Sequence, residues 1–494
     1  MPTVTTPHGT LLGELTGGIT AFKGIPYAAA PSGPNRFRPP QPVESWQGIR
    51  DARAYGPTAP KGPYPAPLDE IIPEVDLPGE DCLNLNVWTP DTAGHRPVLV
   101  WLHGGAFTNG SGSVPLYDGS RFARDGVVCV TINYRLGADG FLAIDDGDTA
   151  NLGLLDQLAA LHWVRENIAV FGGDPANVTV FGESAGAMSI GALLASPRSA
   201  GLFRRAALQS GAAHHAISPA TARLVGHGLA GLLGVPPTRR AIADVPAERL
   251  VRGVEELRAT IAANPDPVLW GEIAQNMMPF EPVVDGALLP VAPIEAISSG
   301  AGADVDILIG TNSDEFRLFL VPTGVLDHIG EPHLRAAAAG YGLDPDEATA
   351  AYRAERPDAS PGELFAALVT DWFYRLPAIR LAEQRSGGAG STFVYEFGWR
   401  PPTFDGRLGA CHTLEMPFVF DRLDDPAMKP LLGTEPPQHL ADAMHSAWVS
   451  FATHGDPGWP AYDSEDRTTM RFDTVSKPLT DPRPRQRTLW DGHR

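Results

Sequence analysis

Residues 177–186 read NVTVFGESAG, and this stretch decides the fold. Its first five residues form a short apolar run rich in β-branched side chains, which is typical of a buried strand. Ser184 follows between Gly182 and Gly186, and residues 185–196 are small and compatible with a helix. In a G-x-S-x-G motif at such a junction, the glycines relieve crowding at a sharp turn that presents the serine hydroxyl. The stretch therefore predicts a strand, a tight turn and a helix whose free N-terminal amides point toward the serine.

Similar apolar runs recur at residues 97–102, 126–132, 205–209, 305–309 and 392–397. They are continuously apolar rather than alternating, which is typical of strands covered on both faces in a parallel sheet. Helical patterns lie between several of them. Residues 155–170 carry apolar side chains at spacings of three and four, as expected for a crossover helix between parallel strands. The sequence therefore predicts an α/β fold with one large, mostly parallel central sheet flanked by helices.

Two long segments, residues 216–300 and 320–390, depart from this alternation. Both carry helical patterns broken by proline and glycine, and we expect them to be helical insertions that form a cap above the sheet. The Pro-rich segment 57–79 predicts an irregular surface loop, because proline removes backbone donors. Since no Gly/Ser linker is long enough to separate domains, we expect residues 1–494 to form a single domain.

The 494-residue chain carries 38 basic and 58 acidic residues, a net charge of −20. Such a field repels nucleic-acid phosphates and anionic membranes, so we expect neither nucleic acid nor membrane as a partner. No window approaches the roughly 18 apolar residues of a membrane span. The N-terminus lacks the basic start and apolar centre of a signal peptide, which predicts a cytoplasmic location, with a mature secreted form as the alternative. Nothing in the sequence specifies an oligomeric state.

The three cysteines, Cys82, Cys129 and Cys411, are too few and too scattered for a disulfide framework or a closed zinc site. No H-E-x-x-H motif or comparable ligand cluster occurs either. We therefore expect no metal and no cofactor, and a metal hydrolase is disfavoured.

A second glycine motif, HGGAF at residues 103–107, follows the apolar run 97–102. Glycines let backbone N–H groups approach a ligand without an intervening side chain, although a tight turn alone also requires them. A serine nucleophile needs such amides to stabilise the oxyanion of its transition state. Because this motif precedes the serine turn, as in lipases and esterases, the pair favours an oxyanion hole.

Serine also needs a general base, and the base needs an acid to orient it. In enzymes with this type of serine turn, the acid and then the histidine follow on loops after later strands. Asp314 and Glu315 follow the run 305–309, and His412 follows the run 392–397. His412 is therefore the strongest base candidate, but position alone does not separate Asp314 from Glu315.

Taken together, these motifs resemble the type B carboxylesterase family, in particular its bacterial para-nitrobenzyl-esterase-like branch, which is related to cholinesterases. The resemblance extends through nearly the whole chain. The matching stretches are residues 22–31, 80–90, 101–107, 132–141, 151–186, 208–212, 310–316 and 412–420.

The resemblance implies an α/β-hydrolase fold and the hydrolysis of a small-molecule carboxylic ester through an acyl-enzyme. It assigns Ser184 as the nucleophile, Glu315 as the acid and His412 as the base. The oxyanion amides that it implies are those of Gly104, Gly105 and Ala185. It also credits Ser210 with a supporting hydrogen bond, with packing beside the sheet as the alternative.

The chain departs from the family pattern at two places. No cysteine precedes Cys82, whereas secreted relatives pair this cysteine with an upstream one, and this supports a reduced compartment. Phe316 stands where many relatives have glycine, and its ring is expected either to pack in the core or to reshape the acyl pocket. Substrate preference is therefore not transferred from relatives.

Other functions use the same residues. The triad is also compatible with an amidase, a carbamate or thioester hydrolase, or an acyltransferase. Some proteins of this fold group are non-catalytic binding proteins, but these typically lack the nucleophile, so the complete triad disfavours that class.

Overall fold

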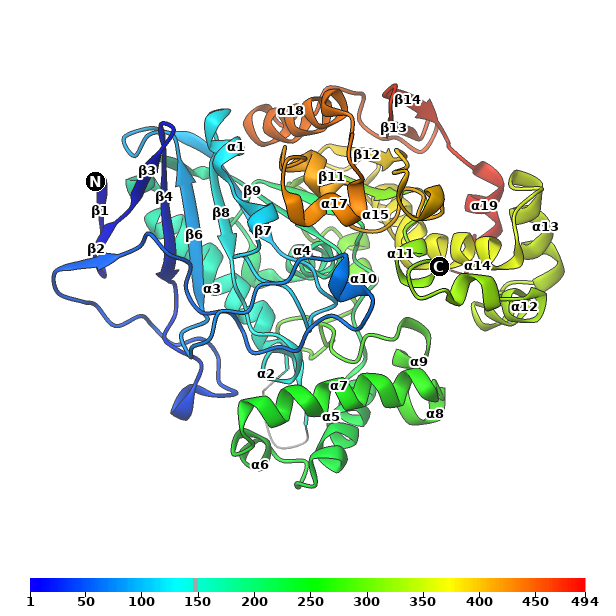
Figure 1. Cartoon of the computed structure of the whole chain (residues 1–494), viewed down its shortest axis with the longest axis horizontal. Helices are drawn as coiled ribbons and strands as arrows, with labels where there is room; N and C mark the ends of the chain where they lie inside the picture. The colour runs from blue at the N-terminus through cyan, green and yellow to red at the C-terminus, as the bar shows by residue number, and fades with distance from the viewer. Residues whose placement is uncertain (145–149, 494) are drawn as a thin grey trace.

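The structure is a computed structural model that describes residues 1–144 and 150–493 (Figure 1). Within these residues, an eleven-stranded sheet runs in the order β14-β13-β12-β11-β10-β9-β7-β8-β6-β4-β3. In this order, neighbouring strands from β13 to β8 pair in parallel. The pairs β14–β13, β8–β6, β6–β4 and β4–β3 at the two edges are antiparallel. The strands are β3 (Glu14–Thr16), β4 (Ile19–Pro26), β6 (Asn84–Thr89), β7 (Arg96–Leu102), β8 (Val128–Ile132), β9 (Gly173–Glu183), β10 (Arg205–Gln209), β11 (Asp306–Asn312), β12 (Thr392–Phe397), β13 (Thr468–Phe472) and β14 (Lys477–Thr480).

Side chains along the central strands are buried on both faces of the sheet. In β7, Val98, Val100 and Leu102 belong to one apolar cluster, and Leu99 and Trp101 belong to the other. Helices cover each cluster, which explains why the strands are continuously apolar. The first cluster packs against α3 (Leu152–Asn167), α4 (Ala185–Ala195) and α15 (Leu376–Arg385), and the second against α1 (Ser120–Arg124) and α18 (Gln438–His454).

The predicted α/β class and the mostly parallel sheet are confirmed. Each of the six predicted apolar runs overlaps a strand, and the run after Ser184 forms helix α4. The crossover helix predicted at residues 155–170 is α3, but it begins earlier and ends at Asn167. A 3₁₀ turn, Ile168–Phe171, follows directly, and Gly172 caps it with a φ of 83°.

The segments predicted as insertions are mainly helical. In α7, Leu250, Val254, Leu257 and Ile261 recur at helical spacing and are buried. Figure 1 shows α5 to α9 together below the sheet, and α12 to α14 to its right. The helices are α5 (Pro219–Leu233), α6 (Arg239–Ala243), α7 (Ala247–Ala263), α8 (Pro267–Trp270), α9 (Ile273–Asn276), α10 (Pro293–Ser298), α12 (Glu331–Gly340), α13 (Pro345–Glu355) and α14 (Pro361–Thr370), with a π-helical turn at Asp371–Arg375 before α15.

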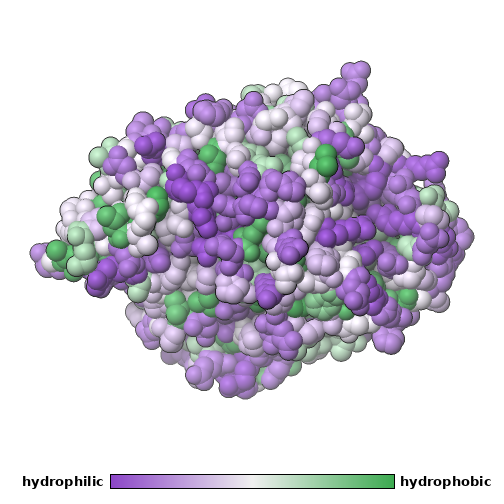
Figure 2. All heavy atoms as spheres, turned by 45° about the horizontal axis from the view of Figure 1, so that its top comes forward, coloured by the Kyte–Doolittle hydropathy of each residue, from purple (hydrophilic) through white to green (hydrophobic). Residues whose placement is uncertain are grey.

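The remaining parts of the chain complete the surface. The Pro-rich segment 57–79 is irregular as predicted, apart from a 3₁₀ turn at Leu68–Glu70. The face drawn in Figure 2 is mostly hydrophilic, with apolar residues in small scattered groups. No helix in the described part of the chain is both long enough and apolar enough to cross a membrane. The other elements are α2 (Gly137–Phe141), α11 (Arg317–Leu320), α16 (Met416–Val419), α17 (Lys429–Leu432), α19 (Pro484–Leu489) and a small sheet of β1 (Thr3–Thr6), β2 (Gly9–Leu12) and β5 (Ile49–Asp51).

Candidate active site

Ser184 occupies the turn between β9 and α4, as the sequence predicts. Its φ of 53° and ψ of −122° are rare for a residue with a side chain, and such strain costs roughly 1–3 kcal/mol. The amide of Ser184 donates to the carbonyl of Gln209 over 2.9 Å, which holds the turn to β10. A Cβ on Gly186 would lie 2.0 Å from the carbonyl oxygen of Leu102, so glycine is required where α4 crosses β7.

Glu315 and His412 meet at the ends of two neighbouring strands. Glu315 follows β11, His412 lies in the loop after β12, and Oε2 of Glu315 is 2.7 Å from Nδ1 of His412. The other oxygen, Oε1, accepts the amide of Asn312 over 2.7 Å. The amide of His412 donates to the carbonyl of Glu315 over 3.1 Å. Both side chains are buried, so the imidazole is fixed in one orientation.

Asp314 and Glu315 were not separated by their positions along the chain, but Asp314 makes different contacts. Its carboxylate accepts the hydroxyl of Ser313 over 2.9 Å and the amide of Ala410 over 3.1 Å. It also pairs with Arg400 at 3.2 Å and with Arg317 at 3.6 Å. Asp314 therefore joins the two loops that carry Glu315 and His412, and of these two adjacent carboxylates it is Glu315 that contacts the imidazole.

Glu183 is a site residue that sequence reasoning missed. Its Oε1 lies 3.1 Å from Nε2 of His412, on the side of the ring opposite Glu315. Because Glu183 directly precedes Ser184, this contact places the imidazole beside the nucleophile. Within the described residues, however, no hydrogen bond joins Ser184 Oγ to His412. The signal was present in the sequence, since Glu183 is part of the G-E-S-A-G motif.

The carboxylates around His412 govern its protonation. Burial lowers the pKa of His412, but Glu183 and Glu315 outweigh this effect and raise it to about 9. Burial raises the pKa of Glu183 to about 8, with His412 opposing the shift and Glu415 and Glu315 adding to it. Nδ1 of the ring is hydrogen-bonded to Glu315, whereas Oε1 of Glu183 lies within ion-pair distance of Nε2 without forming a hydrogen bond, so both carboxylates raise the pKa of the imidazole but only Glu315 orients it.

Glu415 is a second buried carboxylate behind the site, three residues after His412 in the sequence. It accepts Nδ2 of Asn312 over 2.7 Å and Nε2 of Gln209 over 3.1 Å. Burial is the main cause that raises its pKa. Asn312 thus bonds Glu415 through its side chain and Glu315 through its backbone amide, which links this carboxylate to the triad candidates.

The turn after β7 carries the predicted oxyanion amides. A Cβ on Gly104 would lie 3.2 Å from Cβ of Ser184, so this turn packs directly against the nucleophile. Ala185 is the first residue of α4, where backbone amides have no partner inside the helix. In the described chain, the amides of Gly104, Gly105 and Ala185 donate to no protein group, and neither does that of Ala106. The turn after β7 and the start of α4 therefore carry free donors, including one at Ala106 that the sequence did not single out.

Aromatic side chains surround His412. The ring centroid of Tyr374, in the π-helical turn, lies 4.7 Å from that of His412, and the centroid of Phe319 lies 5.6 Å away. Phe316 packs 5.2 Å from Phe319 and against both apolar clusters. Its ring is only partly buried and lies between the apolar core and Phe319, which itself packs on His412. No sequence pattern singled out Tyr374, because a π-helical turn has no clear composition.

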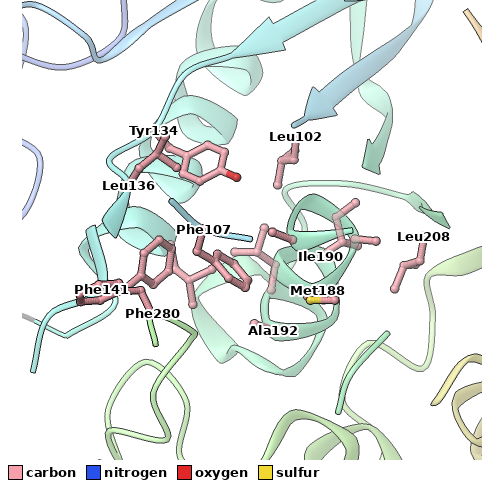
Figure 3. Close-up of a cluster of buried hydrophobic side chains, with 14 of the residues drawn as sticks. Leu102, Phe107, Tyr134, Leu136, Phe141, Met188, Ile190, Ala192, Leu208 and Phe280 are labelled. Carbon is pink, nitrogen blue, oxygen red and sulfur yellow. The ribbon is translucent and has the colours of Figure 1, made fainter. Parts of the chain in front are cut away.

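Phe107 extends from the oxyanion turn into the core. It packs 4.9 Å from Phe141, and Figure 3 shows both rings near Phe280, with Met188 of α4 alongside. The turn is thus anchored in the apolar cluster next to the helix that Ser184 begins.

Two further expectations concern Ser210 and metal ligands. The hydroxyl of Ser210 is buried without a hydrogen-bond partner among the described residues, so the supporting bond implied by the resemblance is not formed. The same residues contain no group of three or more His, Cys, Asp or Glu side chains arranged to hold a metal ion.

Comparisons with known proteins agree with this geometry. The model of the carboxylesterase family matches residues 1–489. The para-nitrobenzyl esterase of Bacillus subtilis is 40% identical, over 98% of this chain and 97% of its own. The phenmedipham hydrolase of Pseudarthrobacter oxydans is 38% identical, over 95% and 94%. The crystal structure of carboxylesterase EST55 from Geobacillus stearothermophilus superposes with a TM-score of 0.86, at 39% identity and with 99% of both chains covered. The fold is therefore the α/β-hydrolase fold, and the chain belongs to the carboxylesterase family as a carboxylic ester hydrolase of the type B group.

Proposed function

We propose that this esterase uses Ser184 as its nucleophile, His412 as its general base and Glu315 as the residue that orients the imidazole. The contact of 2.7 Å between Glu315 and His412 is the observation that carries the proposal. It supplies the base with an orienting carboxylate at the site where the strained Ser184 turn presents a hydroxyl.

The reaction proceeds in two halves. His412 accepts the proton of Ser184 as Oγ attacks the ester carbonyl, and then donates it to the leaving alcohol. Water attacks the acyl-enzyme by the same route and releases the acid. For the first step, Nε2 of His412 must be unprotonated and must exchange its contact with Glu183 for one with Ser184 Oγ.

The oxyanion is proposed to bind the free amides of Gly104, Gly105 and Ala185. These donors are already placed before the substrate arrives, so they stabilise developing charge without reorganisation. The loss of one such donor typically costs about 3 kcal/mol of transition-state stabilisation.

The helical segments 216–300 and 320–390 are proposed to form a cap within a single domain of residues 1–494. Both segments reach the site: Arg258 of α7 bonds Thr108 next to the oxyanion turn, and Tyr374 packs on His412. We also propose a cytoplasmic location and, from the net charge of −20, no nucleic-acid or membrane partners.

Replacement of the nucleophile tests the catalytic roles. With a para-nitrophenyl ester, we expect Ser184→Ala to abolish the burst of product and to lower kcat by at least about 10⁴-fold. Ser298→Ala, at an exposed serine of α10, is the matched control and should keep full activity. Substantial turnover by a folded Ser184→Ala variant would refute the assignment. Matched ester and amide substrates then separate an esterase from an amidase that uses the same triad.

A further inference from the structure

Asn109 lies at the end of the oxyanion turn and contacts three separate parts of the chain. Its amide donates to the carbonyl of Gly105 over 2.9 Å, which closes the turn. Its side-chain Nδ2 donates to the carbonyl of Gly62, in the Pro-rich segment, over 2.8 Å. Its Oδ1 accepts the hydroxyl of Thr108 over 3.2 Å and Nη1 of Arg258 over 3.4 Å. The side chain of Asn109 is buried, so these protein groups replace water around it.

The turn that Asn109 closes is conformationally strained. Gly105, Ala106 and Phe107 have φ values of 115°, 52° and 60°. Ala106 and Phe107 are L residues in the left-handed region, which costs free energy unless surrounding contacts impose it. A Cβ on Gly105 would lie 2.2 Å from the carbonyl oxygen of Asn109, so the turn closes tightly on this residue. The turn that carries the free amides of Gly104 and Gly105 is thus closed at Asn109.

Arg258 brings helix α7 into this arrangement. Its Nη1 donates to Thr108 Oγ1 over 3.3 Å as well as to Asn109. No carboxylate of the described residues forms an ion pair with Arg258 within 4.0 Å. Burial lowers the pKa of Arg258, because the guanidinium is partly withdrawn from water. Neutral acceptors next to the oxyanion turn are therefore the hydrogen-bond partners of this charge.

The Pro-rich segment 57–79 also bonds Gly110, the residue after Asn109. The amide of Gly110 donates to Oε2 of Glu74 over 2.9 Å. The side chain of Lys61 is buried, and it donates to the carbonyl of Val75 over 2.8 Å and lies 3.7 Å from Glu74. Segment 57–79 is therefore fastened to the oxyanion turn through two successive residues, Asn109 and Gly110.

We propose that Asn109 is a positioning residue for the oxyanion hole, and that Arg258 makes the position of its amides depend on helix α7. The inference rests on the proposed function, since it requires the turn after β7 to bind the oxyanion. Because catalysis is sensitive to displacements of about 1 Å, release of this turn lowers the rate more than it weakens substrate binding.

The test measures kcat per active site, KM and the inhibition constant of a trifluoromethyl ketone. This inhibitor adds to Ser184 and forms an oxyanion, so its affinity reports on the amides. Sites are counted by labelling with a fluorophosphonate. We expect Asn109→Ala to lower kcat per labelled site by about 10- to 100-fold, to change KM by less than about 3-fold, and to weaken the ketone in proportion to kcat.

Variants of Arg258 test the link to the cap without altering the turn itself. We expect Arg258→Ala to lower kcat and ketone affinity together by about 3- to 10-fold, and Arg258→Lys to recover part of both because it keeps a charged donor. Arg252→Ala, at an exposed arginine of α7, is the control and should match the wild type.

Two results would overturn the proposal. One is an Asn109→Ala enzyme with wild-type kcat per labelled site and wild-type ketone affinity. If Asn109→Ala does not fold, an Arg258→Ala enzyme with wild-type kcat per labelled site and wild-type ketone affinity overturns the link to α7. Failure of the proposed function gives a different result, because Ser184→Ala would then keep its activity and the wild type would not take the label at Ser184.

Discussion

Glu183 Oε1 lies 3.1 Å from Nε2 of His412, while Glu315 Oε2 lies 2.7 Å from Nδ1 of the same ring. Two buried carboxylates thus lie at the imidazole, and Glu315 is the one hydrogen-bonded to it. Each of them favours the protonated ring, and the proton on Nε2 is the one that must leave before Ser184 can donate its own. Glu183 thus raises the pKa of His412 when it is ionised, without a hydrogen bond to the ring, and Glu315 orients the ring through its hydrogen bond.

This arrangement predicts an alkaline pH profile. The pKa of His412 is raised to about 9, whereas an unperturbed histidine titrates near 6.5. Because only the neutral ring accepts a proton, kcat/KM should rise with pH up to about 9 and be low at pH 6. Glu183→Gln removes one of the two carboxylates, so its profile should shift to lower pH. Rates measured from pH 5 to 10 decide this, and a wild-type limb near 6.5 would contradict the interpretation.

Glu315→Gln tests the orienting role of the acid. The amide keeps the size of the side chain but no longer stabilises the imidazolium that forms during attack, and it can impose the wrong tautomer. We expect kcat to fall by about 10³- to 10⁴-fold with the fold intact. Single-turnover acylation by a para-nitrophenyl ester measures the effect. Acylation within 10-fold of the wild type would exclude Glu315 as the acid.

Asp314→Asn makes the same type of change at the residue next to Glu315, and it should affect stability more than catalysis. Burial raises the pKa of Asp314, but Arg317 and Arg400 outweigh it, so the pKa lies below its usual value. The ionised carboxylate therefore stabilises the fold above the unfolded pKa, and this contribution is lost as pH falls through the lower folded pKa. We expect the variant to unfold about 1–3 kcal/mol more easily at pH 7.

The size of this difference should shrink only below the ordinary aspartate pKa of about 3.9, as urea unfolding at pH 7 and at about pH 2 can measure. Activity should stay within about 10-fold of the wild type, because Asp314 does not touch the imidazole. A loss of kcat as large as that of Glu315→Gln would reverse the roles of the two carboxylates.

The sequence predicted the parts of the site that follow from strand ends. Ser184, Glu315 and His412 come after strands β9, β11 and β12, and parallel strands bring such residues to one edge of the sheet. The choice between Asp314 and Glu315 depended on family resemblance, because one residue of register in a loop decides which carboxylate meets the ring. The structure agrees with that choice through the contact at 2.7 Å.

The contacts of Glu183, Asn109 and Tyr374 could not be predicted in the same way. Glu183 lies inside the serine motif, but only the strained turn at Ser184 directs its carboxylate toward His412. Asn109 acts through segments far from it in the sequence. Tyr374 reaches His412 from a π-helical turn, where an extra residue in the helix changes which side chains face the site.

Tyr374 packs against the imidazole of His412. Its ring lies 4.7 Å from that of His412 at an interplanar angle of 38°, and it supports the imidazole on one face. Tyr374→Phe keeps this ring, so we expect kcat within about 3-fold of the wild type. Tyr374→Ala leaves a cavity beside the imidazole, and loss of a buried aromatic ring costs about 3–5 kcal/mol of stability. Because the imidazole also loses its support, we expect kcat per labelled site to fall by about 10-fold. A Tyr374→Phe variant as impaired as Tyr374→Ala would instead assign the effect to the phenol hydroxyl.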